Sequence, residues 1–205
     1  MNRTSIIAAA LIATAFAATA LAQQPGGAKG GAAVVSEPGK ATAVRAAEIS
    51  AQVVGIEKET RTVTLKGPKG KVVDVVAGDE VRNFDQINLG DFVVVRYAQA
   101  LTLELRKTKA ASGDITVHEE GARAQPGEKP GVAGARQVHA IADVIGVDPQ
   151  KSTITLKDPR GNVVTLNVQN PDQFKVVKKG DQVDVTYTEA VALSVEAAPK
   201  PAAKN

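Results

Sequence analysis

One pattern of strand, turn and strand occurs twice in this chain. The stretch TVTLKGPKGKVV begins at Thr62, and the stretch TITLKDPRGNVV begins 91 residues later, at Thr153. The similarity extends further, because Tyr97 matches Tyr187 at an offset of 90 residues. A match over such a span indicates an internal duplication, and residues present in both copies report on a shared fold more than on a special site.

Alternation of apolar and polar residues predicts β-strands in both copies. The stretch QVDVTY places Val183, Val185 and Tyr187 on one face of a strand and polar side chains on the other. The repeated turn carries Pro68 and Gly70, and these residue types suit the start of a type I turn and a position of positive φ. Each copy therefore contains a hairpin whose inward face is apolar, and the residues expected inside are Val63, Leu65, Val73 and Val75 in the first copy and Ile154, Leu156, Val164 and Leu166 in the second.

The order of the predicted elements favours a particular barrel. Three strands, a short helical segment and two more strands are typical of an OB-like fold. In the first copy the strands are expected near 47–57, 61–67, 71–77, 92–98 and 101–106. The sequence thus predicts an all-β chain with two tandem five-stranded OB-like small β-barrels, and a five- or six-stranded barrel of another topology stays open.

Composition divides the chain into six parts. Arg3, an apolar run and the small residues at 20 and 22 indicate a signal peptide over 1–22 that is cleaved before Gln23. Stretches rich in Gly, Ala and Pro predict disordered tails and a linker between the barrels. The expected parts are a signal peptide 1–22, an N-terminal tail 23–43, a first barrel 44–109, a linker 110–136, a second barrel 137–196 and a C-terminal tail 197–205.

Charge and residue types exclude several functional classes. The chain has 25 basic and 22 acidic residues, no cysteine and few aromatic residues. Thiol chemistry and disulfides are therefore excluded, and neither a basic field nor a stacking platform for nucleic acid is visible. The apolar run of the signal peptide is too short to span a bilayer. We expect a periplasmic or secreted protein, soluble after signal cleavage, with no nucleic-acid partner and no stable membrane insertion.

The repeated motifs resemble those of a known group of proteins. The pattern T-hydrophobic-T-L-K-x-P-x-G-x-V-V, followed by G-D and a strand ending in Tyr, is similar to uncharacterised exported proteobacterial proteins built from small OB-like β-barrel repeats. The resemblance covers nearly all of 45–196. It implies a periplasmic β-barrel module, and it brings no catalytic residue with it.

Few residues qualify as candidates for chemistry. The two histidines, His118 and His139, do not occupy matching positions in the repeats, and neither lies in a triad-like pattern. The stretch from His118 to Glu120 lacks the further ligands that a zinc site needs. Asp91 and Asp181 recur at the entry to a strand, which is a structural position. The sequence therefore assigns no catalytic, cofactor-binding or metal-binding residue and no cofactor, and leaves the ligand-binding residues unknown.

The functional hypothesis is accordingly a broad one. We expect a non-enzymatic exported module that binds a protein partner or a small polar ligand in the cell envelope, with its oligomeric state unknown. Two alternatives stay open: a structural or stress-related periplasmic protein without a discrete ligand, and a hydrolase or metal carrier whose site lies between the barrels. We expect proteases to cut the linker at Arg123 or Lys129 but not at Arg136, whereas resistance at all three sites would favour a linker that packs against both barrels.

Overall fold

The structure is a computed structural model that describes residues 27–106, 109–110 and 113–198. It is all-β, as predicted, with ten strands and three helical segments of three or four residues. The predicted signal peptide and most of the predicted C-terminal tail lie outside the described residues. The elements are β1 (Ala28–Glu37), β2 (Lys40–Glu57), β3 (Thr62–Lys66), η1 (Pro68–Gly70), β4 (Val72–Val76), η2 (Phe84–Gln86), β5 (Phe92–Arg106), β6 (Thr116–Arg123), β7 (Gly131–Asp148), β8 (Thr153–Lys157), β9 (Val163–Asn167), α2 (Gln173–Val176) and β10 (Gln182–Glu196).

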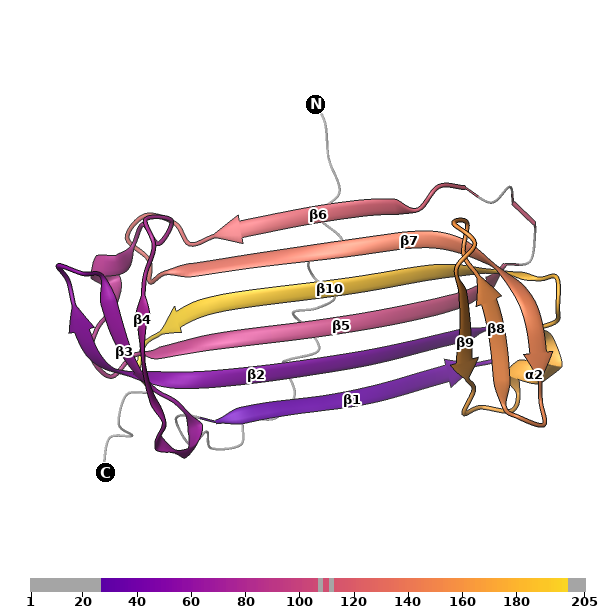
Figure 1. Ribbon diagram of the computed structural model, residues 1–205, viewed down its shortest axis with the longest axis horizontal. Helices are drawn as coiled ribbons and strands as arrows, with labels where there is room; N and C mark the ends of the chain where they lie inside the picture. Colours follow the sequence, from indigo (N-terminus) through magenta and orange to yellow (C-terminus); the bar gives the residue numbers. More distant parts are fainter. Residues whose placement is uncertain (1–26, 107–108, 111–112, 199–205) are drawn as a thin grey trace, which may run out of the picture.

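All ten strands belong to one antiparallel sheet that does not close. Six long strands run side by side in the order β1, β2, β5, β10, β7 and β6, as Figure 1 shows. The prediction of two tandem barrels is not confirmed. The halves are joined instead through the long β5–β10 pair, which runs from Phe92 opposite Glu196 to Arg106 opposite Gln182.

The main error of the sequence prediction was to divide each of these long strands in two. β5 is continuous where strands 92–98 and 101–106 were expected, and β10 is continuous in the same way. The physical reason is visible in the intervening residues 98–101, Ala-Gln-Ala-Leu, which contain neither glycine nor proline to break the strand. Their alternation also continues the pattern of the flanking residues, so one strand satisfies both stretches.

The predicted N-terminal tail and linker are also wrong, because both contain strands. β1 lies within 23–43 and pairs with β2 in a hairpin that extends to Ile49, and β6 lies within 110–136 and pairs with β7 in another that extends to His139. In the first hairpin, Pro38 and Gly39 form the turn, and Gly39 has a φ of +82°. Gly and Ala have low intrinsic strand propensity, so the composition suggested disorder, but pairing with the long strands β2 and β7 overrides that preference.

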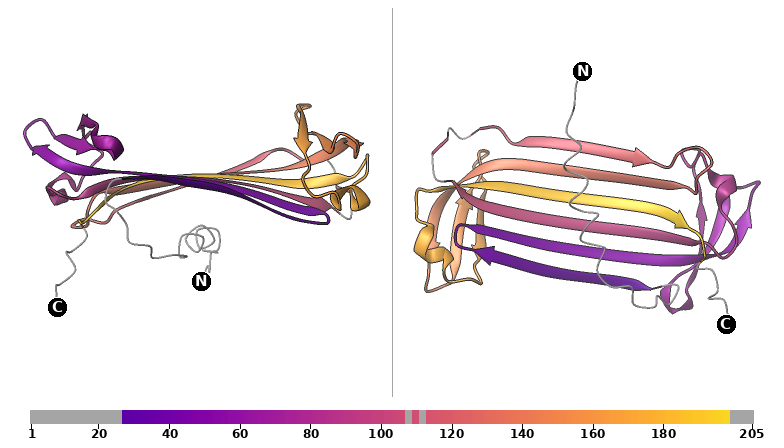
Figure 2. Two further views of the ribbon diagram at one scale, coloured as in Figure 1. Left: turned by 90° about the horizontal axis from the view of Figure 1, so that it is seen from below. Right: turned by 180° about the vertical axis from the view of Figure 1, so that it is seen from behind.

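Two short hairpins fold over the same side of the sheet, one at each end. We call β3–β4 and β8–β9 the flaps and the side that they cover the flap face; the other side is the back face (Figure 2). Each flap begins where a long strand bends at a register shift, between Val53 and Gly55 in β2 and between Val144 and Gly146 in β7. A Cβ on Gly55 would lie 3.0 Å from the side chain of Thr64, so the bend needs glycine there.

Each flap covers a small hydrophobic core, and each core contains residues of both halves. The first core is built on Val53, Val63, Leu65 and Phe84, and Val195 from β10 completes it. The second core is built on Val144, Ile154, Leu156 and Val183, and Leu103 and Leu105 from β5 pack against it. Neither half therefore buries its flap without strand residues of the other half.

The prediction of buried strand faces was right for the inner flap strands and for Leu166 of β9, which packs against the second core, and wrong for the valines of the outer strands. Val63, Leu65, Ile154 and Leu156 are all at most 8% exposed. The valines of β4 and β9 that were expected inside are exposed instead, since these strands lie at open edges of the sheet: Val73, Val75 and Val164. None of the helical segments in the described part of the chain has the length and apolar character needed to cross a bilayer.

Candidate binding pocket

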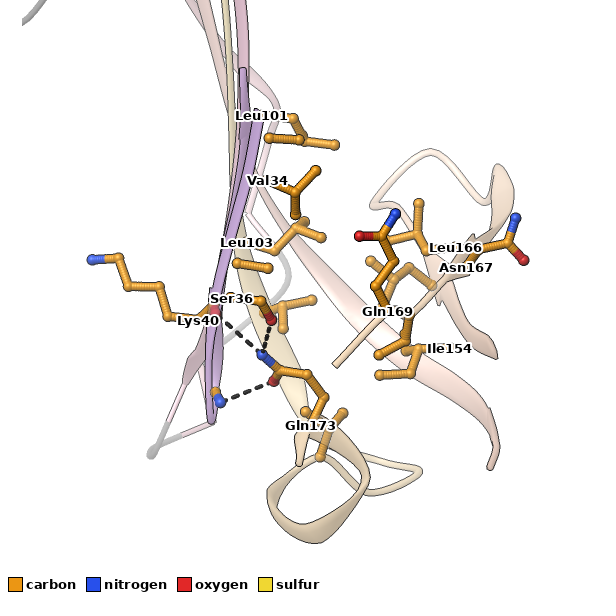
Figure 3. Close-up of a pocket in the computed structure, with 17 residues that line it drawn as sticks. Val34, Ser36, Lys40, Leu101, Leu103, Ile154, Leu166, Asn167, Gln169 and Gln173 are labelled. Carbon is orange, nitrogen blue, oxygen red and sulfur yellow. Dashed lines mark hydrogen bonds between the residues drawn. The ribbon is translucent and has the colours of Figure 1, made fainter. Parts of the chain in front are cut away.

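A pocket of about 250 Å³ opens between the second flap and the flap face of the sheet. Residues of β1, β2 and β5 form one wall, and residues of β8, β9 and α2 form the other (Figure 3), with Val183 at the start of β10 also in the lining. The first half of the chain thus supplies one wall and the second half the other. The apolar lining residues are Val34, Ala41, Ala43, Leu101, Leu103, Ile154, Leu156, Leu166, Val168, Val177 and Val183.

The size of the pocket limits what it can hold. Sites for drug-sized ligands have volumes of about 300–1,000 Å³, whereas a cavity of about 150 Å³ accommodates benzene. At about 250 Å³, this pocket suits a molecule between these limits. Because aliphatic side chains dominate its walls, burial of apolar surface would supply most of the binding free energy.

One glutamine closes the end of the pocket. Gln173 is 6% exposed, and its amide spans the gap between α2 and the turn of the β1–β2 hairpin. The Oε1 atom accepts a hydrogen bond from the backbone N–H of Gly39 at 2.9 Å, and Nε2 donates to Ser36 Oγ at 2.9 Å and to the Lys40 carbonyl at 3.1 Å (Figure 3). These bonds hold the first hairpin against the second flap, so the two walls keep a fixed spacing.

The opposite end of the sheet has a smaller counterpart. A pocket of about 120 Å³ lies between the first flap region and strands β6, β7 and β10. Its lining includes the charged residues Glu80, Arg82 and Arg123, whereas the one charged residue at the larger pocket, Lys40, points its side chain away from the cavity (Figure 3). A similar clasp holds this end, since Asn83 Nδ2 donates to the Gln125 carbonyl at 2.7 Å. The larger pocket is therefore the better site for an apolar ligand.

A polar network lies at the centre of the flap face, between the two pockets. Gln99 of β5 is directly opposite Glu189 of β10. The Tyr97 hydroxyl donates to Glu189 Oε1 at 2.7 Å, and Gln99 Nε2 donates to the Tyr187 hydroxyl at 2.7 Å. The hydrogen bond to Glu189 raises the pKa of Tyr97 to about 12. The polar atoms of these four side chains are hydrogen-bonded to one another across the β5–β10 pair, and this network fixes the register of the two halves.

The residues that the sequence singled out do not form a common site. His118, Glu119 and Glu120 lie exposed on the edge strand β6, and among the described residues no group of histidine and acidic side chains is arranged to hold a metal ion. His139 lies on the back face, with Nε2 3.3 Å from Asp184 Oδ1. Their positions on an edge strand and on the back face separate them from the pocket.

Asp91 and Asp181 have the structural role that their repetition predicted. Oδ2 of each carboxylate accepts the backbone N–H of the residue three positions earlier, Asn88 or Lys178, at 2.8 Å in both cases. Asp91 is 4% exposed and also binds the ammonium group of Lys129. Each aspartate thus closes the turn that leads into a long central strand.

The pocket residues were missed because their signal is spread over three predicted units. Val34 was placed in a disordered tail, Leu103 in one barrel and Leu156 in another. One local signal was present: an amide, Asn83 or Gln173, precedes the phenylalanine at matching positions of both copies. A recurring amide beside a core aromatic residue indicates a buried hydrogen-bonding partner.

Comparisons with known proteins give no family for this chain: no family model, no curated protein and no solved structure matches it.

Proposed function

We propose that this protein is a non-enzymatic, exported binding module that holds a small, mainly apolar molecule in the pocket beneath the second flap. The observation that carries the proposal is the pocket itself, with a volume of about 250 Å³ and walls of aliphatic side chains. Concave, mostly apolar sites with few polar groups are typical of small-molecule binding. The signal-like N-terminus supports an envelope location.

The lining favours an apolar ligand over the polar ligand that the sequence suggested. Three side-chain amides contribute to the lining, at Asn167, Gln169 and Gln173. The amide of Gln173 is already used by the β1–β2 turn, so it offers little to a ligand. Asn167 and Gln169 are exposed residues that could bind one polar group at the mouth of the pocket. The expected ligand therefore has an apolar body and at most one or two polar atoms.

The matching positions of the two halves provide a controlled test. Leu103 lines the larger pocket, and its equivalent Leu193 lines the smaller one. A suitable probe is 1-naphthol, because it has a fused apolar ring system, one hydroxyl group and intrinsic fluorescence. We expect the wild-type protein to bind it with a stoichiometry of one, as measured by fluorescence titration.

Filling either pocket should then distinguish the two sites. Leu103→Trp should abolish binding of 1-naphthol because the indole ring occupies the pocket, whereas Leu193→Trp should leave the affinity within a factor of about two. Circular dichroism and thermal melting check that both variants are folded. Equal binding by both variants, or no binding by the wild-type protein, would contradict the proposed site.

A further inference from the structure

The two outer edges of the long sheet differ in a way that points to a partner. β1 and β6 occupy equivalent positions, because each pairs on one side only, with β2 or with β7. Among the described residues, no strand covers the other side of either. An uncovered strand edge presents unpaired N–H and C=O groups and is a template for pairing with a further strand.

We propose that β1 pairs antiparallel with β1 of a second copy, so that the chain forms a symmetric dimer with a sheet that runs through both molecules. The sequence of β1 is AKGGAAVVSE, which has no proline, no bulge and only two charged residues, Lys29 and Glu37. Every residue of this strand except Ser36 is exposed. The strand is therefore a continuous edge with few of the charges and none of the breaks that usually prevent such pairing.

Hydrogen bonding within the first hairpin determines which backbone groups of β1 are left to pair with a second copy. The backbone N–H of Ser50 donates to the carbonyl of Gly27 at 3.0 Å, so residue 27 forms a hydrogen-bonded pair with β2. Hydrogen-bonded and non-hydrogen-bonded pairs alternate along an antiparallel ladder. The odd-numbered residues of β1 therefore bond to β2, whereas Gly30, Ala32, Val34 and Ser36 direct their N–H and C=O groups outward.

This alternation restricts the register of a symmetric dimer. The outward residues of one copy must pair with outward residues of the other, so an even-numbered residue must oppose an even-numbered one. Placing Ala32 opposite Val34 of the second copy meets this condition and forms about eight backbone hydrogen bonds. In that register Ala33 lies on the two-fold axis, and Lys29 of each copy is opposite Glu37 of the other.

Charge supports this register. Lys29 and Glu37 are both on the back face of their strand, and they would form two equivalent ion pairs across the dimer axis. Within one molecule, their neighbours on β2 have other partners. Glu48, opposite Lys29, binds Arg96 at 2.8 Å, and Lys40, opposite Glu37, binds Glu104 at 3.1 Å. Lys29 and Glu37 are thus the charges that the first hairpin leaves for a second copy.

The equivalent edge strand is unsuited to the same pairing. The sequence of β6, Thr116–Arg123, is TVHEEGAR; all eight residues pair with β7, and Glu119 and Glu120 lie at its centre. A symmetric antiparallel pair of β6 strands would place glutamates of the two copies against each other, and like charges directly opposite are destabilising. One edge is therefore protected by charge and the other is open.

Exposed apolar surface on the described chain also favours association. Eighteen Val, Ile and Leu side chains are exposed, whereas thirteen Val, Ile, Leu and Phe side chains are buried. Val34 and Val35, at 53% and 63% exposed, lie next to the proposed axis. Pairing of β1 would place each of them beside the second copy and remove part of this surface from water.

The test uses the full mature chain from Gln23 in sedimentation velocity across a dilution series. We expect a dimer. Ala32→Pro removes one outward N–H without touching the ladder to β2, so this variant should be monomeric. Glu119→Pro, at the matching outward position of β6, should keep the dimer. Circular dichroism and thermal melting report whether each variant is folded.

Charge reversal tests the register independently of proline. Lys29→Glu and Glu37→Lys should each weaken the dimer at least about tenfold, because each creates two like-charge contacts. An equimolar mixture of the two variants should dimerise again, since every contact in the mixed pair joins opposite charges. This recovery cannot arise from a structural defect in either variant alone.

Amide hydrogen exchange gives a second measurement. The N–H groups of Gly30, Ala32, Val34 and Ser36 should be protected in the wild-type dimer and exchange rapidly in the monomeric proline variant. A wild-type protein that is monomeric at all concentrations would overturn the proposal. So would a dimer that persists in Ala32→Pro, or charge variants whose mixture stays monomeric.

Discussion

Single residues at the centre of the flap face show how the two halves are held in register. Tyr97 donates its hydroxyl hydrogen bond to Glu189, and this bond favours the neutral phenol, so the pKa rises from 10.0 to about 12. Because the protonated hydroxyl makes this bond in the folded state, the bond stabilises the fold at pH values below the pKa of an unfolded tyrosine. That contribution is fully present below about pH 10 and is lost as the pH rises through about 12.

We expect this shift to be visible by absorbance titration of tyrosinate. In a Tyr187→Phe variant, Tyr97 is the remaining tyrosine, and its midpoint should lie near 12. Adding Glu189→Ala removes the acceptor and should return the midpoint toward the ordinary value of 10.0. If the midpoint is the same with and without Glu189, the hydrogen bond across the β5–β10 pair is absent in solution.

A second residue corrects an expectation from strand alternation. Alternation places Asp184 on the wet side of its strand, where replacement by alanine would be neutral. In the structure its two oxygens accept from Arg106 Nη1 at 2.7 and 2.9 Å, and the Asp184 side chain is only 30% exposed. Loss of a hydrogen bond between charged, partly buried groups destabilises proteins by about 1–3 kcal/mol.

Asp184→Ala should therefore lower the free energy of unfolding by about 1–3 kcal/mol in urea denaturation. Glu104→Ala is the control, because Glu104 is 57% exposed and its pair with Lys40 spans 3.1 Å at the surface. Exposed pairs contribute about 0–1 kcal/mol. Equal effects of the two substitutions would mean that the Arg106 contact is no stronger than a surface ion pair.

At the scale of elements, alternation and turn chemistry were sufficient for the parts that fold locally. The flap hairpins were predicted at both places, and Gly70 and Gly161 have the positive φ expected of their turns, +78° and +89°. Local sequence is decisive here because the turn and its two short strands are neighbours in the chain. The inward residues of β3 and β8 followed from the same pattern.

Local sequence patterns could not predict the long strands or the pocket, and the reason is physical. β1 pairs with β2 in a local hairpin, but the composition of β1 and of the first residues of β2 is that of a disordered segment. What stabilises them is the sheet beyond, where β2 pairs with β5 and β5 with β10. Strand pairing across about 90 residues is a tertiary effect that no local pattern contains. The pocket depends on that pairing, so it was missed as well.

The bend that starts each flap can be tested at matching glycines. A Cβ on Gly55 would lie 3.0 Å from Cβ and Oγ1 of Thr64, whereas on Gly146 it would lie 3.4 Å from the same atoms of Thr155. Gly55→Ala should therefore cost about 1–3 kcal/mol of stability through overpacking, and more than Gly146→Ala. Combining Gly55→Ala with Thr64→Ala should recover part of the loss. Urea denaturation measures all three, and the reverse order would contradict this explanation of the bend.

At the scale of the whole molecule, the two halves depend on each other. Val195 of the second half completes the core under the first flap, and Leu103 and Leu105 of the first half pack on the core under the second flap. Side-chain contacts add to this dependence, because Arg96 binds Glu196 at 2.6 Å and Arg106 binds Asp184 at 2.7 Å. The two halves therefore share one sheet and both cores, and we expect them to unfold as one cooperative unit, in contrast to two separate barrels.

Fragments of the chain provide the decisive test of this dependence. Chains 23–109 and 110–205 each retain one flap, but each loses the central strand that completes its core and half of the β5–β10 ladder. We expect each fragment alone to show no cooperative thermal transition, and an equimolar mixture to recover the β-type circular dichroism and the melting transition of the intact chain.

In the intact chain, Arg123 and Arg136 lie in paired strands and Lys129 binds Asp91, so trypsin should cut there slowly. Cooperative melting of either fragment alone, or rapid cleavage at these three sites, would instead favour independently folded halves joined by a flexible linker.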